Sequence, residues 1–235
     1  MNISPSDWEY EREATEPTVS VVISTIPSND HQVVCEYLVE QNFCKDWEII
    51  VVNCPNLDRC EARNFGLNKS QASIVAFTDD DTRPPSDWVQ SIANAFEKND
   101  DLVCLEGPVE GGIRYGGERQ YVGCNMAVDR DEAIKQGGWN SQYAGWREDT
   151  EFGWRMEADA AGICKFVEDA TMIHPDSPRT HYDHRLETQL KKNYPRRYEK
   201  IFNKSLAEKG WRIGQRIGVV PIINSVRNQL RADNS

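Results

Sequence analysis

The most restrictive feature of this 235-residue chain is an alternation of short apolar runs with segments of helical spacing. The runs at 19–25 and 47–53 are rich in Val and Ile, which predicts strands that are buried on both faces. Runs at 73–79 and 102–109 have a similar composition. Strands that alternate with helices in this way predict an α/β fold with a parallel sheet.

The segments between these runs carry the helix signals. Apolar spacing predicts helices at 30–42, 59–70 and 86–99, and Ser86 is the expected N-cap of the last one. Residues 1–17 are polar and acidic and are predicted to form a flexible or loosely docked lead. The second half is less regular, and we expect a strand and a short helix in 121–139, a helix at 148–162, two strands in 164–176, and one or two helices after 179.

Charge divides the chain into two parts. Residues 1–178 carry 14 Lys and Arg against 33 Asp and Glu, a net charge of −19, whereas residues 179–235 carry 13 against 5, a net charge of +8. The acidic body argues against nucleic acid as a partner. We therefore expect an α/β domain at 18–178 and a basic helical segment at 179–235.

Two interpretations of the basic segment stay open. Its charges could be solvated on a helix that packs on the domain, or it could form a peripheral surface that contacts anionic membrane lipid. No run of about 18 apolar residues exists, and the start lacks the features of a signal peptide. These absences predict a cytoplasmic location, which includes the cytoplasmic face of the membrane. Seven scattered cysteines without a Cys-x-x-Cys pair predict reduced core thiols.

Three consecutive carboxylates, Asp79, Asp80 and Asp81, end the third apolar run. They repel one another and raise one another's pKa unless a partner removes the repulsion. Mg²⁺ or Mn²⁺ prefers such oxygen ligands and shares its shell with phosphates. Because α/β sheets bind ligands at the carboxyl ends of strands, the triplet favours a metal–diphosphate site over a solvated acidic turn. His174 is a structural residue by default, but an imidazole can complete an oxygen-rich Mn²⁺ site.

A second acidic cluster, Glu148, Asp149 and Glu151, begins the helix expected at 148–162. The helix N-terminus alone stabilises such carboxylates by about 0.3–1 kcal/mol each. The flanking Trp146 and Trp154 would desolvate a carboxylate, which could then act as a general base near neutral pH. Aromatic faces also suit sugar rings.

The order of these motifs resembles family 2 glycosyltransferases of the GT-A fold, over about residues 18–178. The matching stretches are VSVVIST, WEIIVVN, ARNFGLNKSQASIVAFTDDDTRPPSDWV, GCNMAVDRDEAIKQGGWN, REDTEFGWRM and MIHPD. The resemblance implies a Rossmann-like nucleotide-diphospho-sugar transferase fold with a mainly parallel central sheet. Residues 18–109 would be its nucleotide-binding half and 110–178 its acceptor half.

The resemblance also implies an activity. It is the metal-dependent, inverting transfer of a sugar from a nucleotide-diphosphate sugar to an acceptor hydroxyl, in glycan or glycolipid assembly. A UDP-sugar is the first candidate donor, and the acceptor would be a glycan or a lipid-linked molecule. Asn53 stands where members carry an Asp that accepts the uracil N–H, and an Asn amide can accept as well as donate.

Site residues follow from the same resemblance. Asp79 would contact the ribose or the metal shell, Arg63 would pair with the diphosphate or cap the base, and Asp80 is expected to tolerate change best. The residues implied to contact the nucleotide sugar are Thr25, Asn53, Arg63, Asp79 and Asp80.

The remaining roles concern the metal and the reaction. Asp81 and His174 would bind Mn²⁺ or Mg²⁺, and Asp149 would be the catalytic base. The residues implied on the acceptor or sugar side are Asn125, Trp146 and Glu148.

Two other function classes predict features that this chain lacks. A nucleotidyltransferase shares the sheet and the acidic site, but it should carry a Gly-rich basic loop after the first strand, and STIPSNDHQ has neither Gly nor Lys. A non-catalytic glycan-binding domain predicts the loss of one carboxylate cluster, and both are present.

Overall fold

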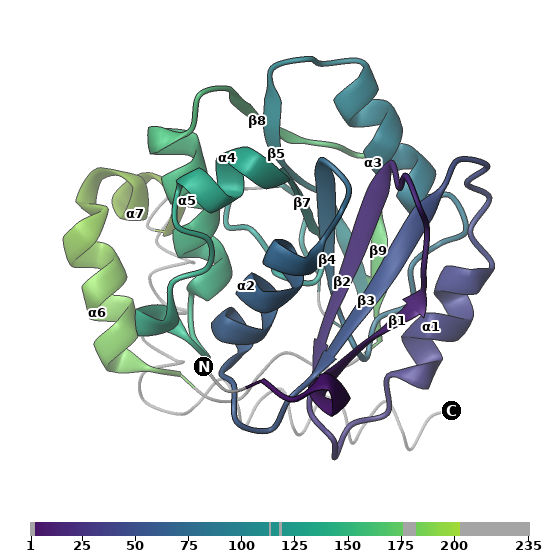
Figure 1. Cartoon of the computed structure of the whole chain (residues 1–235). Coiled ribbons are helices and arrows are strands. Elements are labelled where there is room, and N and C mark those ends of the chain that lie inside the picture. Colours follow the sequence, from purple (N-terminus) through teal and green to yellow (C-terminus); the bar gives the residue numbers. More distant parts are fainter. Residues whose placement is uncertain (1–2, 113, 118, 176–181, 203–235) are drawn as a thin grey trace, which may run out of the picture. The chain divides into compact units, whose positions relative to one another are not determined.

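The computed structural model describes residues 3–112, 114–117, 119–175 and 182–202. The chain divides into two compact units after Ser177 (Figure 1). In the second unit the described residues form α6 (His184–Asn193) and α7 (Pro195–Phe202). No helix within the described ranges is long and apolar enough to cross a membrane. Most of the predicted basic helical segment, residues 203–235, lies outside the described residues.

A seven-stranded sheet forms the centre of the first unit, counted over the described residues, in the order β1-β3-β2-β4-β7-β5-β8. Strands β1 and β7 run antiparallel to their neighbours, and the other five are parallel to one another. The predicted mainly parallel α/β sheet is therefore confirmed. The strands are β1 (Trp8–Arg12), β2 (Val19–Thr25), β3 (Trp47–Asn53), β4 (Ile74–Asp79), β5 (Leu102–Glu106), β7 (Met126–Asp129) and β8 (Ile163–Phe166).

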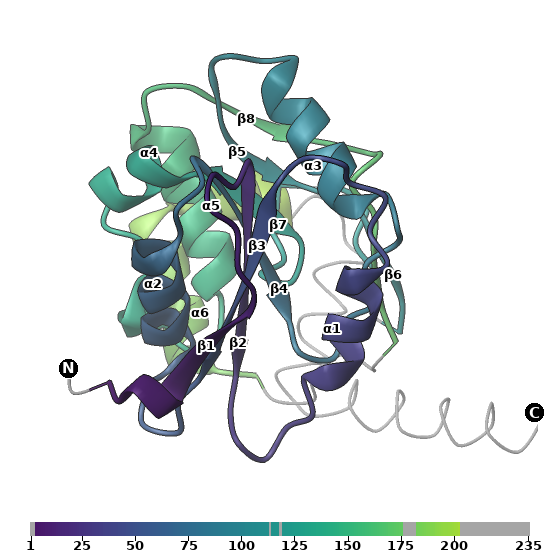
Figure 2. The same cartoon turned by 45° about the vertical axis from the view of Figure 1, so that its right-hand side comes forward.

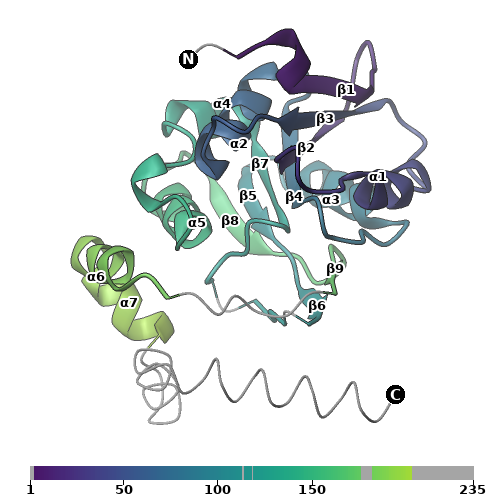
Figure 3. The same cartoon turned by 90° about the horizontal axis from the view of Figure 1, so that it is seen from below.

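Helices cover both faces of this sheet, which explains why its central strands lack polar alternation. Figures 2 and 3 show α2, α4 and α5 on one face and α1 and α3 on the other. Nearly every residue of β2, β3 and β4 is buried, as expected for parallel strands covered on two sides. The helices are α1 (Gln32–Val39), α2 (Arg59–Lys69), α3 (Trp88–Glu97), α4 (Arg130–Lys135) and α5 (Glu148–Asp159).

The direction of β7 determines which residues meet at one edge of the sheet. Because β7 runs antiparallel to β4, with Phe77 opposite Met126, the start of β7 lies beside the end of β4. Strands β2, β3 and β4 are parallel and end at this same edge. The edge therefore collects residues that follow three strands and residues that precede a fourth.

A small parallel sheet brings a distant segment to the same edge. It pairs β6 (Val109–Gly111) with β9 (Met172–His174), which lie side by side in Figure 3. The backbone N–H of Arg83, just after β4, donates to the carbonyl of Ile173 at 2.8 Å. This bond holds the chain beside His174 against the turn that follows β4.

Two local predictions were wrong. Ser86 does not cap α3: the N-cap position is Asp87, and the Ser86 hydroxyl accepts a hydrogen bond from the Asn42 amide at 3.1 Å. The N-terminal lead is not loose throughout, because Trp8–Arg12 pairs antiparallel with β3 as an edge strand. Its charged side chains made the segment resemble a tail, but charges are common on edge strands.

The cysteines follow the prediction of reduced thiols. All seven are free, and five of them are buried. Cys44 is exposed and Cys164 is partly exposed, so these two are not core residues.

Candidate functional site

The site begins with three neighbouring strand ends. Thr25 and Asn53 end β2 and β3 as register partners, and Asp79 ends β4 beside Ser24. The parallel register therefore gathers polar residues at one edge of the sheet, as the sequence predicted for the carboxyl ends of the strands.

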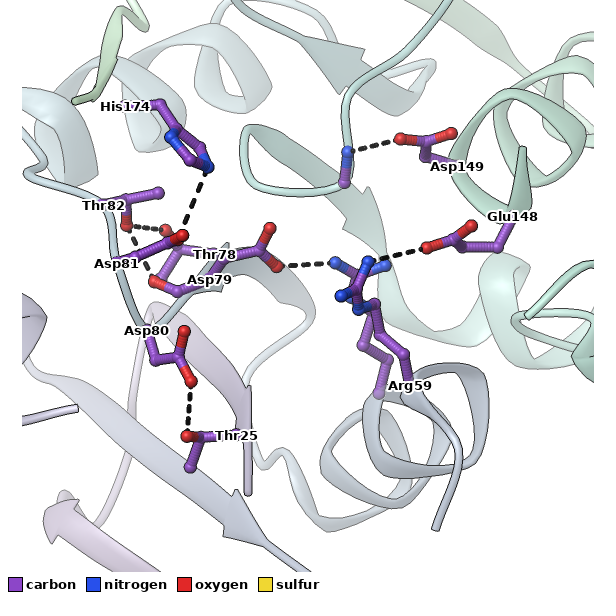
Figure 4. A network of polar contacts seen from close by, with 12 residues as sticks. Thr25, Arg59, Thr78, Asp79, Asp80, Asp81, Thr82, Glu148, Asp149 and His174 are labelled. Atoms are coloured by element: carbon purple, nitrogen blue, oxygen red, sulfur yellow. Dashed lines mark hydrogen bonds and ion pairs between the residues drawn. The ribbon is translucent and has the colours of Figure 1, made fainter. Parts of the chain in front are cut away.

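A buried turn fixes the backbone of the aspartate triplet. The hydroxyl of Thr82 donates to the carbonyl of Asp79 at 2.8 Å and is hydrogen-bonded to the hydroxyl of Thr78 at 2.7 Å. Both threonines are fully buried. The turn sends successive side chains of the triplet in different directions, as Figure 4 shows.

Asp79 points toward helix α2. Its Oδ1 accepts a hydrogen bond from Nη2 of Arg63 at 2.7 Å, and the Arg63 side chain is only 2% exposed. The guanidinium also lies over the ring of Trp139, 4.4 Å from its centroid. Arg63 is thus the internal counter-ion of Asp79. Its contact with the diphosphate or the base stays a prediction: Nη2 is paired with Asp79, whereas Nε and Nη1 are buried and have no hydrogen-bond partner among the described residues.

Asp80 turns the other way, toward the loop after β2. Its Oδ2 accepts hydrogen bonds from the hydroxyl of Thr25 at 2.5 Å and from the amide of Asn29 at 2.9 Å. The hydroxyl of Thr25 is therefore bonded to Asp80, and its contact with the nucleotide stays a prediction. Asp80 was expected to tolerate change best, yet its carboxylate ties two loops together.

Asp81 faces His174. The Nε2 of His174 lies 3.4 Å from Oδ1 of Asp81. Both Asp81 Oδ1 and His174 Nδ1 are buried and lack a hydrogen-bond partner among the described residues. A bound cation would satisfy the Asp81 oxygen, and the imidazole beside it could share the ion.

Cys124 joins this group. One ligand atom each from Asp79, Cys124 and His174 lie within 4.8 Å of one another. Carboxylate, thiol and imidazole are all donors to divalent metals. With Asp81 beside them, these residues fit a divalent cation.

Surrounding charges give the two outer aspartates different pKa shifts. Burial raises the pKa of Asp79, but the guanidinium groups of Arg63 and Arg59 outweigh it and hold the pKa below its usual range. Burial raises the pKa of Asp81 and, together with the charges of Asp79 and Asp80, outweighs the opposing effect of His174. Asp81 is therefore the carboxylate that still needs a positive partner.

The second acidic cluster begins α5, as predicted. Arg147 is its N-cap and adopts a left-handed conformation, with φ of 67°. Glu148 is 2% exposed and accepts a hydrogen bond from Nη1 of Arg59 at 3.1 Å. Burial and the neighbouring Asp149 charge raise the pKa of Glu148. Trp146 is half-buried, and the Arg147 guanidinium lies 5.2 Å from its ring centroid.

Asp149 is half-buried and held by backbone donors. The N–H of Gly123 donates to Oδ2 at 3.2 Å, and the N–H of Thr150 donates to Oδ1 at 2.7 Å. A Cβ at position 123 would lie 2.7 Å from Nη2 of Arg63, so glycine allows the backbone to approach the guanidinium. The residue that contacts Asp149, Gly123, therefore directly precedes Cys124.

Two more predicted residues have contrasting positions. Asn125 is fully buried: its oxygen accepts from the Trp88 indole at 2.8 Å, and its nitrogen donates to the carbonyls of Pro108 and Ala170. Its amide joins three segments of the core, and its acceptor-side role stays a prediction. Asn53, in contrast, has a buried Oδ1 with no hydrogen-bond partner among the described residues.

Sequence reasoning missed Arg59, Cys124 and Asn29. Arg59 precedes Arg63 by four residues in α2 and so lies on the same helix face, a spacing that could have revealed it. Cys124 carried no usable signal, because its contact with Asp79 depends on the antiparallel direction of β7.

Comparisons with known proteins agree with this architecture. The family model described as Glycosyl transferase family 2 matches residues 27–146. This range contains the aspartate triplet and Cys124 and ends before Asp149 and His174. No curated protein matches the chain.

Solved structures give the same fold at low sequence identity. S. aureus TarS 1-349 in complex with UDP-GlcNAc has a TM-score of 0.56 and 11% identity, covering 82% of this chain and 77% of that one. A longer chain of S. aureus TarS has a TM-score of 0.59 and 13% identity, covering 84% of this chain and 48% of that one. The mannosyltransferase PcManGT from Pyrobaculum calidifontis, in complex with GDP-Man and Mn²⁺, has a TM-score of 0.53 and 14% identity. The match covers 84% of this chain and 68% of that one. The predicted GT-A fold is thus confirmed.

The Arg63–Asp79 pair leads to a stability prediction. Asp79→Asn should lower the free energy of unfolding at pH 7 by about 3–5 kcal/mol, because it leaves a buried guanidinium without a counter-charge. Urea unfolding of wild type and variant measures the difference. Asp80→Asn is the control and should cost about 1 kcal/mol, because no buried cation depends on it.

The same pair sets a pH dependence. The pKa of Asp79 is lowered in the folded state, so its stabilisation is present above the unfolded pKa of about 3.9 and is lost as pH falls through the folded value. The gap between wild type and Asp79→Asn should therefore narrow below about pH 4. An Asp79→Asn protein as stable as wild type at pH 7 would contradict the role given to this pair.

Proposed function

The chain belongs to glycosyl transferase family 2, and from this premise we propose that it is a metal-dependent, inverting enzyme. In this proposal it moves a sugar from a nucleotide-diphosphate sugar to an acceptor hydroxyl, with Asp149 as the base. Asp81 and His174 hold the cation, together with Asp79 at its edge.

One observation carries the proposal. Gly123 donates its N–H to Asp149 and is followed directly by Cys124, whose thiol lies beside Asp79 and His174. The half-buried carboxylate of α5 and the group of metal donors are therefore linked through two consecutive residues. This supports a single centre with a base on one side and a diphosphate-binding cation on the other, the separation that a displacement reaction requires.

The step itself is a single displacement at the anomeric carbon. The acceptor oxygen forms a bond to that carbon while the bond to the diphosphate oxygen breaks, and the configuration inverts. Asp149 takes the proton of the acceptor hydroxyl at one of its carboxylate oxygens. A divalent cation, Mn²⁺ or Mg²⁺, would supply Lewis-acid stabilisation of the leaving diphosphate.

The protein prepares Asp149 for this role through its backbone contacts. Hydrogen bonds from Gly123 and Thr150 orient the carboxylate before the reaction. Glu148 is turned away to Arg59 and is nearly inaccessible, so it acts as a positioning residue and not as the base.

We propose a UDP-sugar as the donor. The unpartnered Oδ1 of Asn53 at the end of β3 supports this, since it would accept the N–H of a uracil placed at the strand end. Among the similar structures, the TarS complex contains UDP-GlcNAc and the PcManGT complex contains GDP-Man. The acceptor side would be formed by Trp146 beside the start of α5, which suits a glycan or a lipid-linked acceptor in glycan assembly.

Asp149→Asn tests the base. The variant should lose about 100-fold or more in kcat, because an amide cannot take the acceptor proton, while nucleotide binding stays unchanged. Product formation under donor saturation and calorimetric titration with the nucleotide measure the two quantities. Asp159→Asn, at the exposed end of the same helix, is the matched control. Full activity in Asp149→Asn would refute the assignment.

A thermal-shift panel of nucleotide sugars with and without Mn²⁺ tests the donor and the metal together. We expect one UDP-sugar to raise Tm only when Mn²⁺ is present, by an amount equivalent to about 2.7 kcal/mol at 100 times Kd. Asp81→Asn should abolish the Tm shift that the sugar produces in the presence of Mn²⁺. A shift by the same sugar without any metal, or by no nucleotide sugar at all, would count against the proposal.

We further propose that the basic segment contacts anionic membrane, at the cytoplasmic face. Exposed basic side chains on α6 and α7 support this: Lys191, Lys192, Arg196 and Lys200. Deleting residues 205–235 should reduce sedimentation with anionic liposomes and leave Mn²⁺ binding intact. Unchanged sedimentation of the truncated protein would refute a membrane contact through residues 205–235.

A further inference from the structure

The strand register explains why a cysteine stands beside the aspartates. Phe77 and Met126 are opposite partners in the antiparallel β4–β7 pair. Asp79, two residues beyond Phe77, ends β4, and Cys124 lies in the turn two residues before Met126, where β7 begins. The antiparallel pair therefore brings the end of β4 and the turn before β7 to the same edge of the sheet.

The distances in the group suit a shared cation. Metal bonds of about 2.0–2.3 Å keep two ligand atoms within roughly 4.6 Å of each other. The donor atoms of Asp79, Cys124 and His174 lie within 4.8 Å of one another, so small side-chain movements bring all three to one ion. Asp81 is outside this group of three, but its Oδ1 lies 3.4 Å from Nε2 of His174, so it would be the next donor to reach the ion.

The surroundings of these atoms favour ligation over simple packing. His174 is 6% exposed, and its Nδ1 has no hydrogen-bond partner within the described part of the chain. Cys124 is 1% exposed. The buried thiols of Cys60 and Cys104 donate to main-chain carbonyls, at 3.5 and 3.9 Å, whereas no such bond is found for Cys124 among the described residues.

We propose that Cys124 is a sulfur ligand of the cation and makes this centre select thiophilic metals. The inference rests on the proposed metal-dependent function and adds the ligand that decides which metal is bound. On binding, the thiol loses its proton to solvent and the thiolate coordinates the ion. Thiolate and imidazole favour Co²⁺ and Zn²⁺ over Mg²⁺, which prefers a shell of oxygen atoms.

Co²⁺ titration of the full chain tests the proposal without an activity assay. Binding to wild type should produce a thiolate-to-cobalt charge-transfer band in the near-ultraviolet. Cys124→Ser should lose this band and bind Co²⁺ about 10-fold or more weakly, because a first ligand is worth at least as much as the groups that support it. Its affinity for Mg²⁺ should change much less, since a hydroxyl oxygen replaces the sulfur.

Controls separate the role of Cys124 from those of other thiols and ligands. Cys44→Ser removes an exposed thiol that could bind Co²⁺ by itself and should keep the band. Asp81→Asn should weaken Co²⁺ binding whether or not Cys124 is a ligand. Thermal unfolding confirms that each variant is folded. If Cys124→Ser does not fold, the absence of a charge-transfer band in wild type would still refute the proposal.

Four results would overturn the assignment. Co²⁺ binding to wild type without a charge-transfer band would exclude the thiolate and leave the metal-dependent function in place. A band that persists in Cys124→Ser, or that disappears in Cys44→Ser, would assign it to another thiol. Failure of wild type to bind any divalent cation would refute both this inference and the metal dependence of the proposed function.

Discussion

Mutual repulsion of three adjacent carboxylates is the constraint on which the rest of this structure depends. Asp79, Asp80 and Asp81 coexist because each meets a different partner. Asp79 is neutralised by the buried guanidinium of Arg63, and Asp80 is held by neutral donors of the loop after β2. Within the described part of the chain, Asp81 faces His174, 3.4 Å away. The fold thus removes most of the repulsion internally and leaves one carboxylate for a cation.

The internal counter-ion has structural consequences. Arg63 is fully buried, so its charge must be compensated where it lies, and Asp79 and the ring of Trp139 supply this. Gly123 is needed so that the backbone can approach the guanidinium. Its N–H then contacts Asp149. A single ion pair therefore helps to determine where the second acidic cluster lies relative to the first.

The second arginine of α2 has a complementary position. Arg59 is partly exposed, donates to the buried Glu148, and acts electrostatically on Asp79. It lies between the two acidic clusters in Figure 4. Two arginines four residues apart on one helix thus serve both acidic clusters, and they keep Glu148 away from the position that Asp149 occupies.

The sequence by itself determined the layered α/β architecture, because Val- and Ile-rich runs that alternate with amphipathic segments have few other ways to bury their apolar side chains. It also determined that carboxylates would end β4 and begin α5, since both positions follow from local patterns. Tertiary structure alone decided the direction of β7, and with it the place of Cys124 beside Asp79. It also decided that Arg63, Thr25 and Asn125 would be committed within the protein. These outcomes depend on pairing between segments far apart in the chain, and periodicity within a segment contains no information about strand direction or about which partner a polar side chain will meet.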